Sequence, residues 1–413
     1  MQTDRVYYLL FGLYTLSGWF VAPVYALFLM SRGLDLFQID VVLAVYLLTV
    51  FAFEVPTGAI ADAFGRKTSF LASCAVRTVA FVLYAFADDF GDCLIAEVID
   101  GVGTTLASGS LEAWAVDRMR SEGREGSLDA FFARAQTLTR VAMIGGGILC
   151  GVIAARSYAL AWTVGASGFV LAGVLGALLM REDRPRGEVS ALLRSPLPLA
   201  REGFAALRGS PVLALLCALT AATYFAALPA HMLWQPRTQE LTGGGPRLMG
   251  WVWALLNVAT LIGSEVLPRL LGRFARERVL AAAVLWRAAL LSIAALATRA
   301  PLVIGGFLVQ EVSVGMTEPV LQSWTNDHVP AERRATLLSV RSMFGTLGGG
   351  IGLLVIGLVA RDHGARIAWL VSAAIFALAA PGFLALGRLE AKQGPAAPVI
   401  PAGAVPAKVV PPG

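Results

Sequence analysis

The stretch GAIADAFGRK (residues 58–67) joins two long apolar segments, near 39–61 and 68–87. About twenty apolar residues are the length that a helix needs to cross the hydrocarbon of a bilayer. Gly65 permits a tight turn between two helices. Arg66 and Lys67 are expected to hold this turn in the cytoplasm, because cations favour that side of a membrane. The stretch therefore predicts a short loop between two transmembrane helices.

The composition extends this prediction to the whole chain. Of the 413 residues, 57% are hydrophobic and only 15% are charged, against about 25% charged in soluble domains. The apolar runs are continuous rather than alternating, which favours helices over a barrel. We expect an all-α membrane protein with twelve transmembrane helices near 6–30, 39–61, 68–87, 92–117, 130–154, 157–180, 211–234, 247–266, 279–298, 301–326, 335–360 and 365–387.

The chain divides into two similar halves. We expect six-helix bundles at 1–180 and 211–389, a charged cytoplasmic linker at 181–210 and a disordered tail at 390–413. A shift of 210 residues pairs Tyr14 with Tyr224, Phe64 with Phe274, Arg66 with Arg276, Arg77 with Arg287, Trp114 with Trp324, and Asp117 with Asp327. Matches in the same order predict a duplicated six-helix unit in parallel orientation.

Positive charge predicts the orientation. Few of the 33 Lys and Arg fall in loops on one side: Arg32, Arg156, Arg237, Arg247, Arg299, Arg361 and Arg366. Since cytoplasmic loops carry an excess of cations, both termini are expected to be cytoplasmic. Arginine far outnumbers lysine and there is no Asn-x-Ser/Thr sequon, which favours a bacterial cytoplasmic membrane.

The spacing Gly58-x-x-x-Asp62-x-x-Gly65-Arg66-Lys67 resembles the signature loop of the major facilitator superfamily. The resemblance extends from about residue 6 to residue 389 and implies a transporter in which helices one, four, seven and ten line a central cavity. Gly58 is expected to let its helix approach a neighbour closely.

The resemblance also implies a gate. In that family the residues equivalent to Asp62 and Arg66 join an acidic residue at the end of helix four, which matches Asp117, and together they latch the outward-open state. The gating candidates are therefore Gly58, Asp62, Gly65, Arg66, Lys67 and Asp117. In the second repeat Gly272 stands where Asp62 maps, so a latch there must differ.

Helices four and ten each carry a polar stripe. On a wheel of 100° per residue, an arc of about 120° on helix four holds Glu97, Asp100, Gly101, Thr104, Ser108 and Glu112, and one of about 80° on helix ten holds Glu311, Gly315, Glu318, Gln322 and Thr325. A charged carboxylate at mid-bilayer costs about 2.5–3.5 kcal/mol. These groups are expected to face water, substrate or a partner such as Arg77, Arg140 or Arg287.

The candidates for binding substrate or protons combine these stripes with a carboxyl on helix two and aromatic residues on helices one and seven. They are Tyr14, Glu54, Glu97, Asp100, Thr104, Tyr224, Glu311, Glu318 and Gln322. Tyrosine rings on facing helices can stack on a cationic solute. Internal ion pairing of the carboxyls and simple packing of the tyrosines remain the alternatives.

The function expected is secondary active transport of a small molecule. There is no phosphate-binding loop for ATP, and buried carboxyls suit proton coupling. An acidic cavity with aromatic residues favours efflux of a drug-like or amphipathic compound by an antiporter. Proton-linked uptake of a nutrient or metabolite is the alternative, and a non-transporting receptor is a third. Glycines 145–147 and 151 resemble the antiporter signature only in part, because its proline is missing, and they also suit close helix packing.

Other classes have less support. The sequence offers no nucleophile–base pair and no His/Asp/Glu metal cluster, so we expect no enzyme, no metal site and no cofactor. The scattered cations do not suggest nucleic-acid binding. A monomer in the lipid bilayer is expected.

Overall fold

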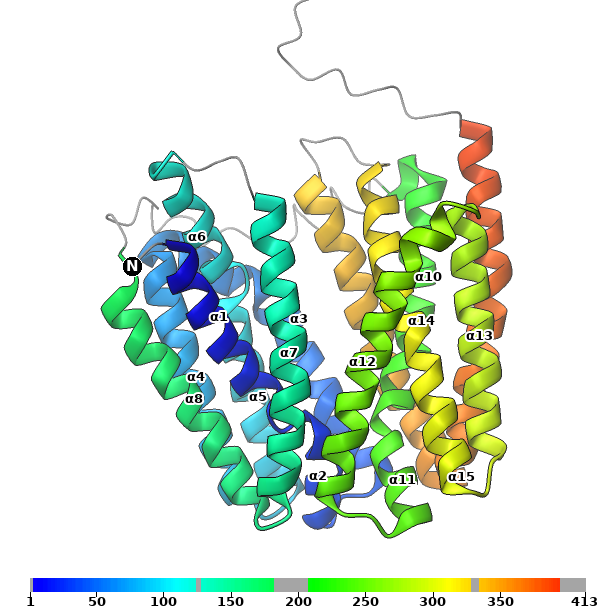
Figure 1. The fold of residues 1–413 in the computed structure, drawn as a ribbon, viewed down its shortest axis with the longest axis horizontal. Helices are drawn as coiled ribbons and strands as arrows, with labels where there is room; N and C mark the ends of the chain where they lie inside the picture. Colours follow the sequence, from blue (N-terminus) through cyan, green and yellow to red (C-terminus); the bar gives the residue numbers. More distant parts are fainter. Residues whose placement is uncertain (1–2, 124–127, 182–206, 328–333, 394–413) are drawn as a thin grey trace, which may run out of the picture.

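The computed structural model describes residues 3–123, 128–181, 207–327 and 334–393. These residues form two helical bundles side by side (Figure 1). The first contains α1 (Thr3–Trp19), the short 3₁₀ helix η1 (Ala22–Val24), α2 (Tyr25–Ser31), α3 (Leu36–Phe64), α4 (Arg66–Phe86), α5 (Phe90–Ala107), α6 (Ser110–Ser121), α7 (Leu128–Ala154) and α8 (Tyr158–Leu179). The second contains α10 (Pro211–Met232), α11 (Trp234–Thr242), α12 (Pro246–Leu271), α13 (Arg276–Leu296), α14 (Ala300–Asp327) and α15 (Arg334–Gln393).

Ten stretches of the described residues are long and apolar enough to cross a membrane. The last, Leu338–Lys392, contains two helices that meet at Gly364, where φ is 78°. The α5–α6 segment adds a crossing that is more polar than the others. The described part of the chain thus contains the twelve crossings predicted, six in each bundle.

Two predicted helices are broken, and the reasons are local. The first is interrupted by η1, which carries Pro23 in its opening turn, where a missing N–H and a fixed φ favour a break. The fourth breaks between α5 and α6, because Gly109 has φ 66°, a left-handed conformation that favours glycine. The seventh, expected at 211–234, ends at Met232, and Leu233 joins it to the separate short helix α11.

The ends of the domains differ from the sequence prediction in one respect. Residues 390–393, expected to begin a disordered tail, continue the last helix to Gln393. The rest of the predicted tail and most of the predicted 181–210 linker lie outside the described residues.

The turn in the 58–67 stretch forms as expected. Gly65 has φ 97° and ψ 150°, a conformation that only glycine adopts without strain. Its N–H donates to Ala61 O at 3.0 Å, and its carbonyl accepts from Ser69 N at 3.1 Å. One residue therefore ends α3 and begins α4. We call the end of the molecule with this turn the loop end and the opposite end, with α2 and α11, the far end.

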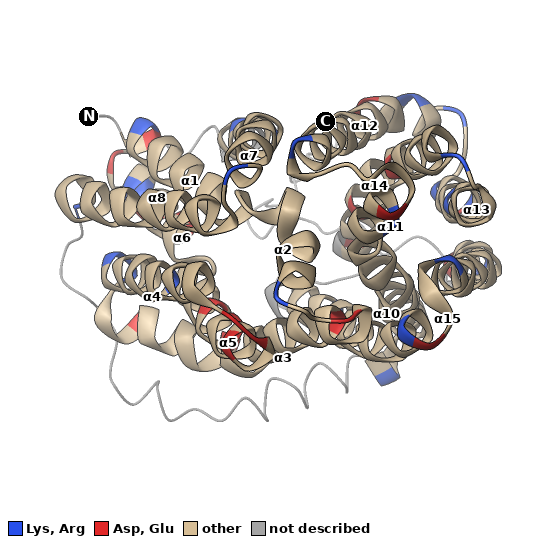
Figure 2. Ribbon diagram, turned by 90° about the horizontal axis from the view of Figure 1, so that it is seen from below, with Lys and Arg blue, Asp and Glu red and all other residues tan. Residues whose placement is uncertain are grey.

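The bundles contact each other in the far-end half. Viewed from the far end, α2 lies between the bundles and α7 lies beside α12 (Figure 2), while α3 packs mainly against α15. Helices α7 and α12 touch through glycines: a Cβ added at Gly151 would lie 2.7 Å from Pro246 O and 3.0 Å from the Cα of Gly250. A backbone contact this close requires glycine.

A glutamine adds a polar link between the bundles at the same end. The Gln235 side chain, on α11, accepts from Ala26 N at 3.0 Å and Leu27 N at 3.4 Å and donates to Ala22 O at 2.9 Å. These bonds give partners to backbone groups that the break around η1 leaves without helical ones. Buried backbone N–H and C=O groups need such partners. The far end is closed by this link and by the glycine contact.

Candidate functional site

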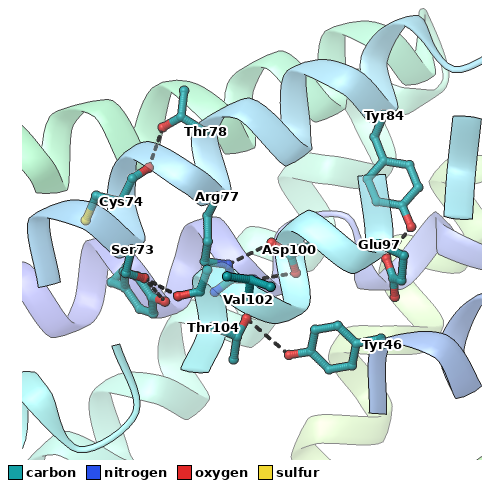
Figure 3. Close-up of polar contacts among 12 residues, drawn as sticks. Tyr46, Ser73, Cys74, Arg77, Thr78, Tyr84, Glu97, Asp100, Val102 and Thr104 are labelled. Carbon is teal, nitrogen blue, oxygen red and sulfur yellow. Dashed lines mark hydrogen bonds and ion pairs between the residues drawn. The ribbon is translucent and has the colours of Figure 1, made fainter. Parts of the chain in front are cut away.

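A buried ion pair joins α4 and α5 in the first bundle (Figure 3). Arg77 on α4 donates from Nε to Asp100 Oδ1 at 2.8 Å and from Nη2 to Asp100 Oδ2 at 3.0 Å. The guanidinium also lies over the rings of Phe169, at 4.5 Å, and Tyr14, at 5.3 Å. This geometry is the two-point pairing that arginine forms with carboxylates, so each charge is compensated inside the bundle.

Tyrosine hydroxyls surround the other polar groups of α5. Glu97 accepts hydrogen bonds from Tyr25 at 3.0 Å and from Tyr84. Tyr46 on α3 donates to Thr104 Oγ1 at 3.2 Å. Figure 3 shows Tyr46 and Tyr84 pointing toward α5 from different helices. Glu97, Asp100 and Thr104, three predicted candidates on α5, thus all have partners within the first bundle.

The second bundle repeats this arrangement with a change. Arg287 Nε donates to Gln310 Oε1 at 2.9 Å, and Gln310 Nε2 donates to Glu311 Oε1 at 2.6 Å. Glu311 is buried, and its Oε1 lies 3.8 Å from Nδ1 of His231 on α10. The carboxyl of this bundle thus faces an imidazole of α10 rather than an arginine alone.

Toward the loop end the candidate residues are exposed. Glu54 on α3 accepts a hydrogen bond from Ser108 at 2.7 Å, and Gln322 on α14 is exposed. Glu318 on α14 pairs with Arg341 Nη2 at 2.6 Å, although its side chain is 46% exposed. Carboxylates do not face lipid readily, so these groups indicate a hydrated surface shared by both bundles at this end.

The two equivalent tyrosines have different surroundings. Tyr14 donates to or accepts from Ser73 at 2.8 Å and packs on Phe70 and Phe169 inside the first bundle. Tyr224 on α10 is 37% exposed. Their sequence equivalence therefore does not give them equal access to a solute in this conformation.

The residues of the predicted helix-four stripe have different partners. The break at Gly109 follows all of them except Glu112, so it does not explain this difference. Asp100 points to α4 rather than sharing a direction with Ser108, whose hydroxyl reaches α3. The predicted stripe is thus divided between an internal network and an exposed edge.

The gating candidates lie around the Gly65 turn. Arg66 Nε lies 3.2 Å from Asp117 Oδ2, with both side chains partly exposed. Lys67 Nζ donates to Ala177 O at 2.8 Å and Met180 O at 2.7 Å, so it caps the end of α8. Cations are favoured at that helix end.

Two further gating candidates have no close partner. Asp62 is exposed and, within the described residues, makes no hydrogen bond or ion pair. A Cβ added at Gly58 would meet nothing within 4 Å. The expected close approach of α3 at Gly58 is therefore wrong for this conformation, because no helix packs there.

The second repeat has the equivalent ion pair. Arg276 Nη1 lies 2.6 Å from Asp327 Oδ2, and Nη2 lies 2.6 Å from Glu390 Oε1. The guanidinium lies 4.7 Å from the ring centre of Trp324. The Arg66–Asp117 pair is thus repeated at the loop end of both bundles, with an added acidic partner in the second.

Sequence reasoning missed several partners. Tyr25, Tyr84 and His231 belong to the polar networks, and Gln235 and Asp40 lie between the bundles. Only Asp40 had a usable signal, a carboxyl near the start of an apolar run. The others are recognised only when distant helices are placed together.

Comparisons with known proteins agree with this architecture. The family described as Major Facilitator Superfamily matches residues 7–264 and again 232–411. An uncharacterised transporter of the same type, YxaM of Bacillus subtilis (strain 168), is 31% identical over 121 residues, which is 29% of this chain and 30% of that protein's length.

Solved structures share the fold at low sequence identity. The nucleoside transporter NupG superposes with a TM-score of 0.77 at 14% identity, covering 94% of this chain and 100% of that one. The peptide transporter POT in complex with sulfate gives 0.74 at 13% identity, covering 94% and 95%. The duplicated bundles, the 58–67 loop and the family match over nearly the whole sequence lead to one conclusion: the chain belongs to the Major Facilitator Superfamily and is a multi-pass membrane transporter.

Proposed function

We propose that this transporter exports a small cationic or amphipathic compound in exchange for protons, by alternating access in a bacterial cytoplasmic membrane. The observation that carries the proposal is the asymmetry between the two ends. Both bundles expose polar side chains toward the loop end, while the far end is closed by Gln235 and by the Gly151–Gly250 contact. A solute could enter from the loop end and leave only after the bundles rearrange.

The exposed polar groups support a cationic substrate. Glu54 is exposed, and its hydrogen bond comes from the uncharged hydroxyl of Ser108. Its charge is therefore available to a cation, whereas Glu318 is balanced by Arg341. The exposed ring of Tyr224 offers a surface for stacking. These groups favour organic cations over anions.

Proton coupling is proposed for at least one of Glu54, Asp100, Glu311 and Glu318. Asp100 is fixed by two hydrogen bonds from Arg77, so a structural role suits it best. Glu311 is buried, and its Oε1 lies 3.8 Å from Nδ1 of His231 rather than in a two-point pair with an arginine. We therefore put Glu311 first among the four.

Flux in proteoliposomes tests the proposal. An organic cation, a neutral analogue of the same size, a nucleoside and a dipeptide are each offered with and without a pH gradient. We expect pH-driven movement of the cation, a several-fold loss of affinity for it in Glu54→Gln, and little change for the neutral analogue. If the gradient instead drives the nucleoside or the dipeptide toward the side of the membrane that corresponds to the cytoplasm, the result would support uptake. If none of the four solutes moves, the result would count against transport of these kinds of compound.

The coupling group is identified with variants. Glu54→Gln, Asp100→Asn, Glu311→Gln and Glu318→Gln are compared in two modes, pH-driven accumulation and exchange of solute without a gradient. The coupling variant should lose accumulation and keep exchange. If all four keep pH-driven accumulation, the coupling proton binds elsewhere.

A further inference from the structure

One carboxyl at the far end is unlike all those described above. Asp40 lies in the second turn of α3, and its side chain is 0% exposed. Neither of its carboxyl oxygens has a hydrogen-bond partner within the described residues. It is a buried acid that the proposed substrate and coupling residues do not include.

Asp40 lies between the bundles. A Cβ added at Gly357 of α15 would lie 2.8 Å from Asp40 Oδ2 and 3.0 Å from Asp40 Cβ, so the acid fills a hollow that only glycine leaves open. Ile39 of α3 and Ile356 of α15, each next in sequence to this contact, belong to one buried apolar cluster. Helices α3 and α15 belong to different bundles, so this environment exists only while the far end is closed.

Nearby charged groups do not compensate the carboxyl. In the far-end half of α3 and of the elements packed against it, the titratable groups are Tyr25, Arg32, Asp35, Tyr46, Arg77, Tyr84, Asp92, Cys93, Glu97, Asp100, Tyr224, His231, Arg361, Asp362, His363 and Arg366. The cations among them nearest in sequence to the contact have other partners: Arg32 lies 3.5 Å from Asp88, and Arg361 lies 2.8 Å from Asp362 and over the ring of Phe37. None donates a hydrogen bond to Asp40.

Burial of an ionised carboxylate without a partner costs far more than burial of the neutral acid. The closed far end therefore requires Asp40 to carry a proton. When α15 separates from α3, water reaches the carboxyl and the proton can leave. We infer that Asp40 is a proton-binding site whose occupancy controls closure of the far end.

Linkage makes this control reciprocal. A proton that binds Asp40 favours closure by the same factor by which closure favours binding of the proton. The sign follows directly: low pH favours the closed far end seen here, and high pH favours separation of α3 from α15. For one proton, the ratio of open to closed molecules changes at most about tenfold per pH unit.

This inference deepens the proposed function by adding a proton site that opens toward the far side, and it rests on that function only for the physiological use of the proton. Its test needs neither solute nor gradient. Spin labels are placed at Arg156 and Thr298, exposed positions in far-end loops of the two bundles, after replacement of the four buried cysteines, Cys74, Cys93, Cys150 and Cys217, by alanine. Distance distributions are then measured in lipid nanodiscs between pH 5 and pH 9.

We expect the labels in the otherwise unchanged chain to move apart as pH rises. Asp40→Asn, which resembles the protonated acid in shape, should stay closed at every pH, and the smaller Asp40→Ser should do the same if the asparagine variant folds poorly. Asp88→Asn removes a far-end carboxyl that is 88% exposed and should keep the pH response. A pH response retained in both Asp40 variants, or a chain that stays closed at pH 9, overturns the inference, whatever the flux experiments show.

Discussion

Gln310 occupies in the second bundle the place that Asp100 occupies in the first, and each accepts a hydrogen bond from the Nε of an arginine 23 residues away, at 2.9 Å and 2.8 Å. The carboxylate of the second bundle has moved to the next residue, Glu311, which accepts from Gln310 at 2.6 Å. The same position in the repeat therefore contains an arginine–carboxylate ion pair in the first bundle and an arginine–glutamine pair in the second, where the neighbouring carboxyl of Glu311 lies beside His231.

Replacement of Asp100 by asparagine should destabilise the protein. Arg77 would remain buried without its counter-charge, a loss that costs about 3–5 kcal/mol in buried pairs. The matched change Gln310→Met removes two hydrogen bonds, from Arg287 and to Glu311, but no charge, and should cost about 1–3 kcal/mol for each buried group left without a partner. Thermal unfolding of the purified protein measures both. An Asp100→Asn protein with unchanged stability and no pH-driven accumulation would instead give Asp100 the coupling role.

The Gly65 turn yields a second prediction with an internal control. Gly65→Ala forces a side chain into a conformation with φ 97°, which costs about 1–3 kcal/mol. Gly58→Ala, seven residues earlier in the same stretch, meets nothing within 4 Å and should be neutral or stabilising by up to about 1 kcal/mol. Melting temperatures distinguish them. A stable Gly58→Ala protein that binds solute but does not transport it would show that α3 approaches a neighbour in the other conformation.

The third prediction concerns the gate at the loop end. The Arg66–Asp117 pair is partly exposed, so Asp117→Asn should change stability by no more than about 1 kcal/mol. If Asp62 joins this pair in the other conformation, Asp62→Asn and Asp117→Asn should each reduce transport several-fold, and the double variant should be little worse than either. Initial rates of flux measure this, with Asp362→Asn as an exposed control. Independent, multiplying defects would contradict a shared latch.

The fourth prediction concerns the link at the far end. Gln235→Ala leaves the N–H groups of Ala26 and Leu27 buried without a partner, at a cost of about 1–3 kcal/mol. The far-end-open population should rise roughly tenfold or more, visible in the same label distances used for Asp40. Gln239→Ala changes a glutamine one turn later on α11 and should leave the distances unchanged. Equal effects of the two variants would mean that the link does not hold the closed state.

Orientation is the fifth prediction. The cation bias predicts that both termini and the connection between the bundles are cytoplasmic. Reporter fusions after Leu389 and Gly187 should be active with a reporter that works in the cytoplasm and silent with one that needs the periplasm. Activity of the periplasmic reporter at either position would reverse the assignment of the loop end.

The sequence predicted the parts of the fold that depend on local chemistry. Apolar runs long enough to span a bilayer predicted twelve crossings, and Gly65 predicted the turn that its φ of 97° now shows. The pairing of Arg66 with Asp117, implied by the family resemblance, is also present, at 3.2 Å. The breaks near Pro23 and Gly109 were missed, since both residues also occur inside continuous membrane helices.

The networks were harder to predict because they depend on which faces meet. The stripe on helix four identified Asp100 correctly as a polar residue that needs a partner. A wheel could not tell that this partner is Arg77 in the same bundle. Nor could it show that Gln235 reaches the backbone at Ala22 and Ala26, because that contact forms only between the assembled bundles.

The contact of Gly151 with Gly250 has a practical consequence. It joins two backbones directly, with a Cβ at Gly250 expected only 2.6 Å from Gly147 O, so no side chain can rotate aside to accept a larger residue. An alanine at either position acts as a wedge that favours separation of α7 from α12. Such a wedge offers a way to trap the opposite conformation for structure determination, without inhibitor, antibody or bound solute.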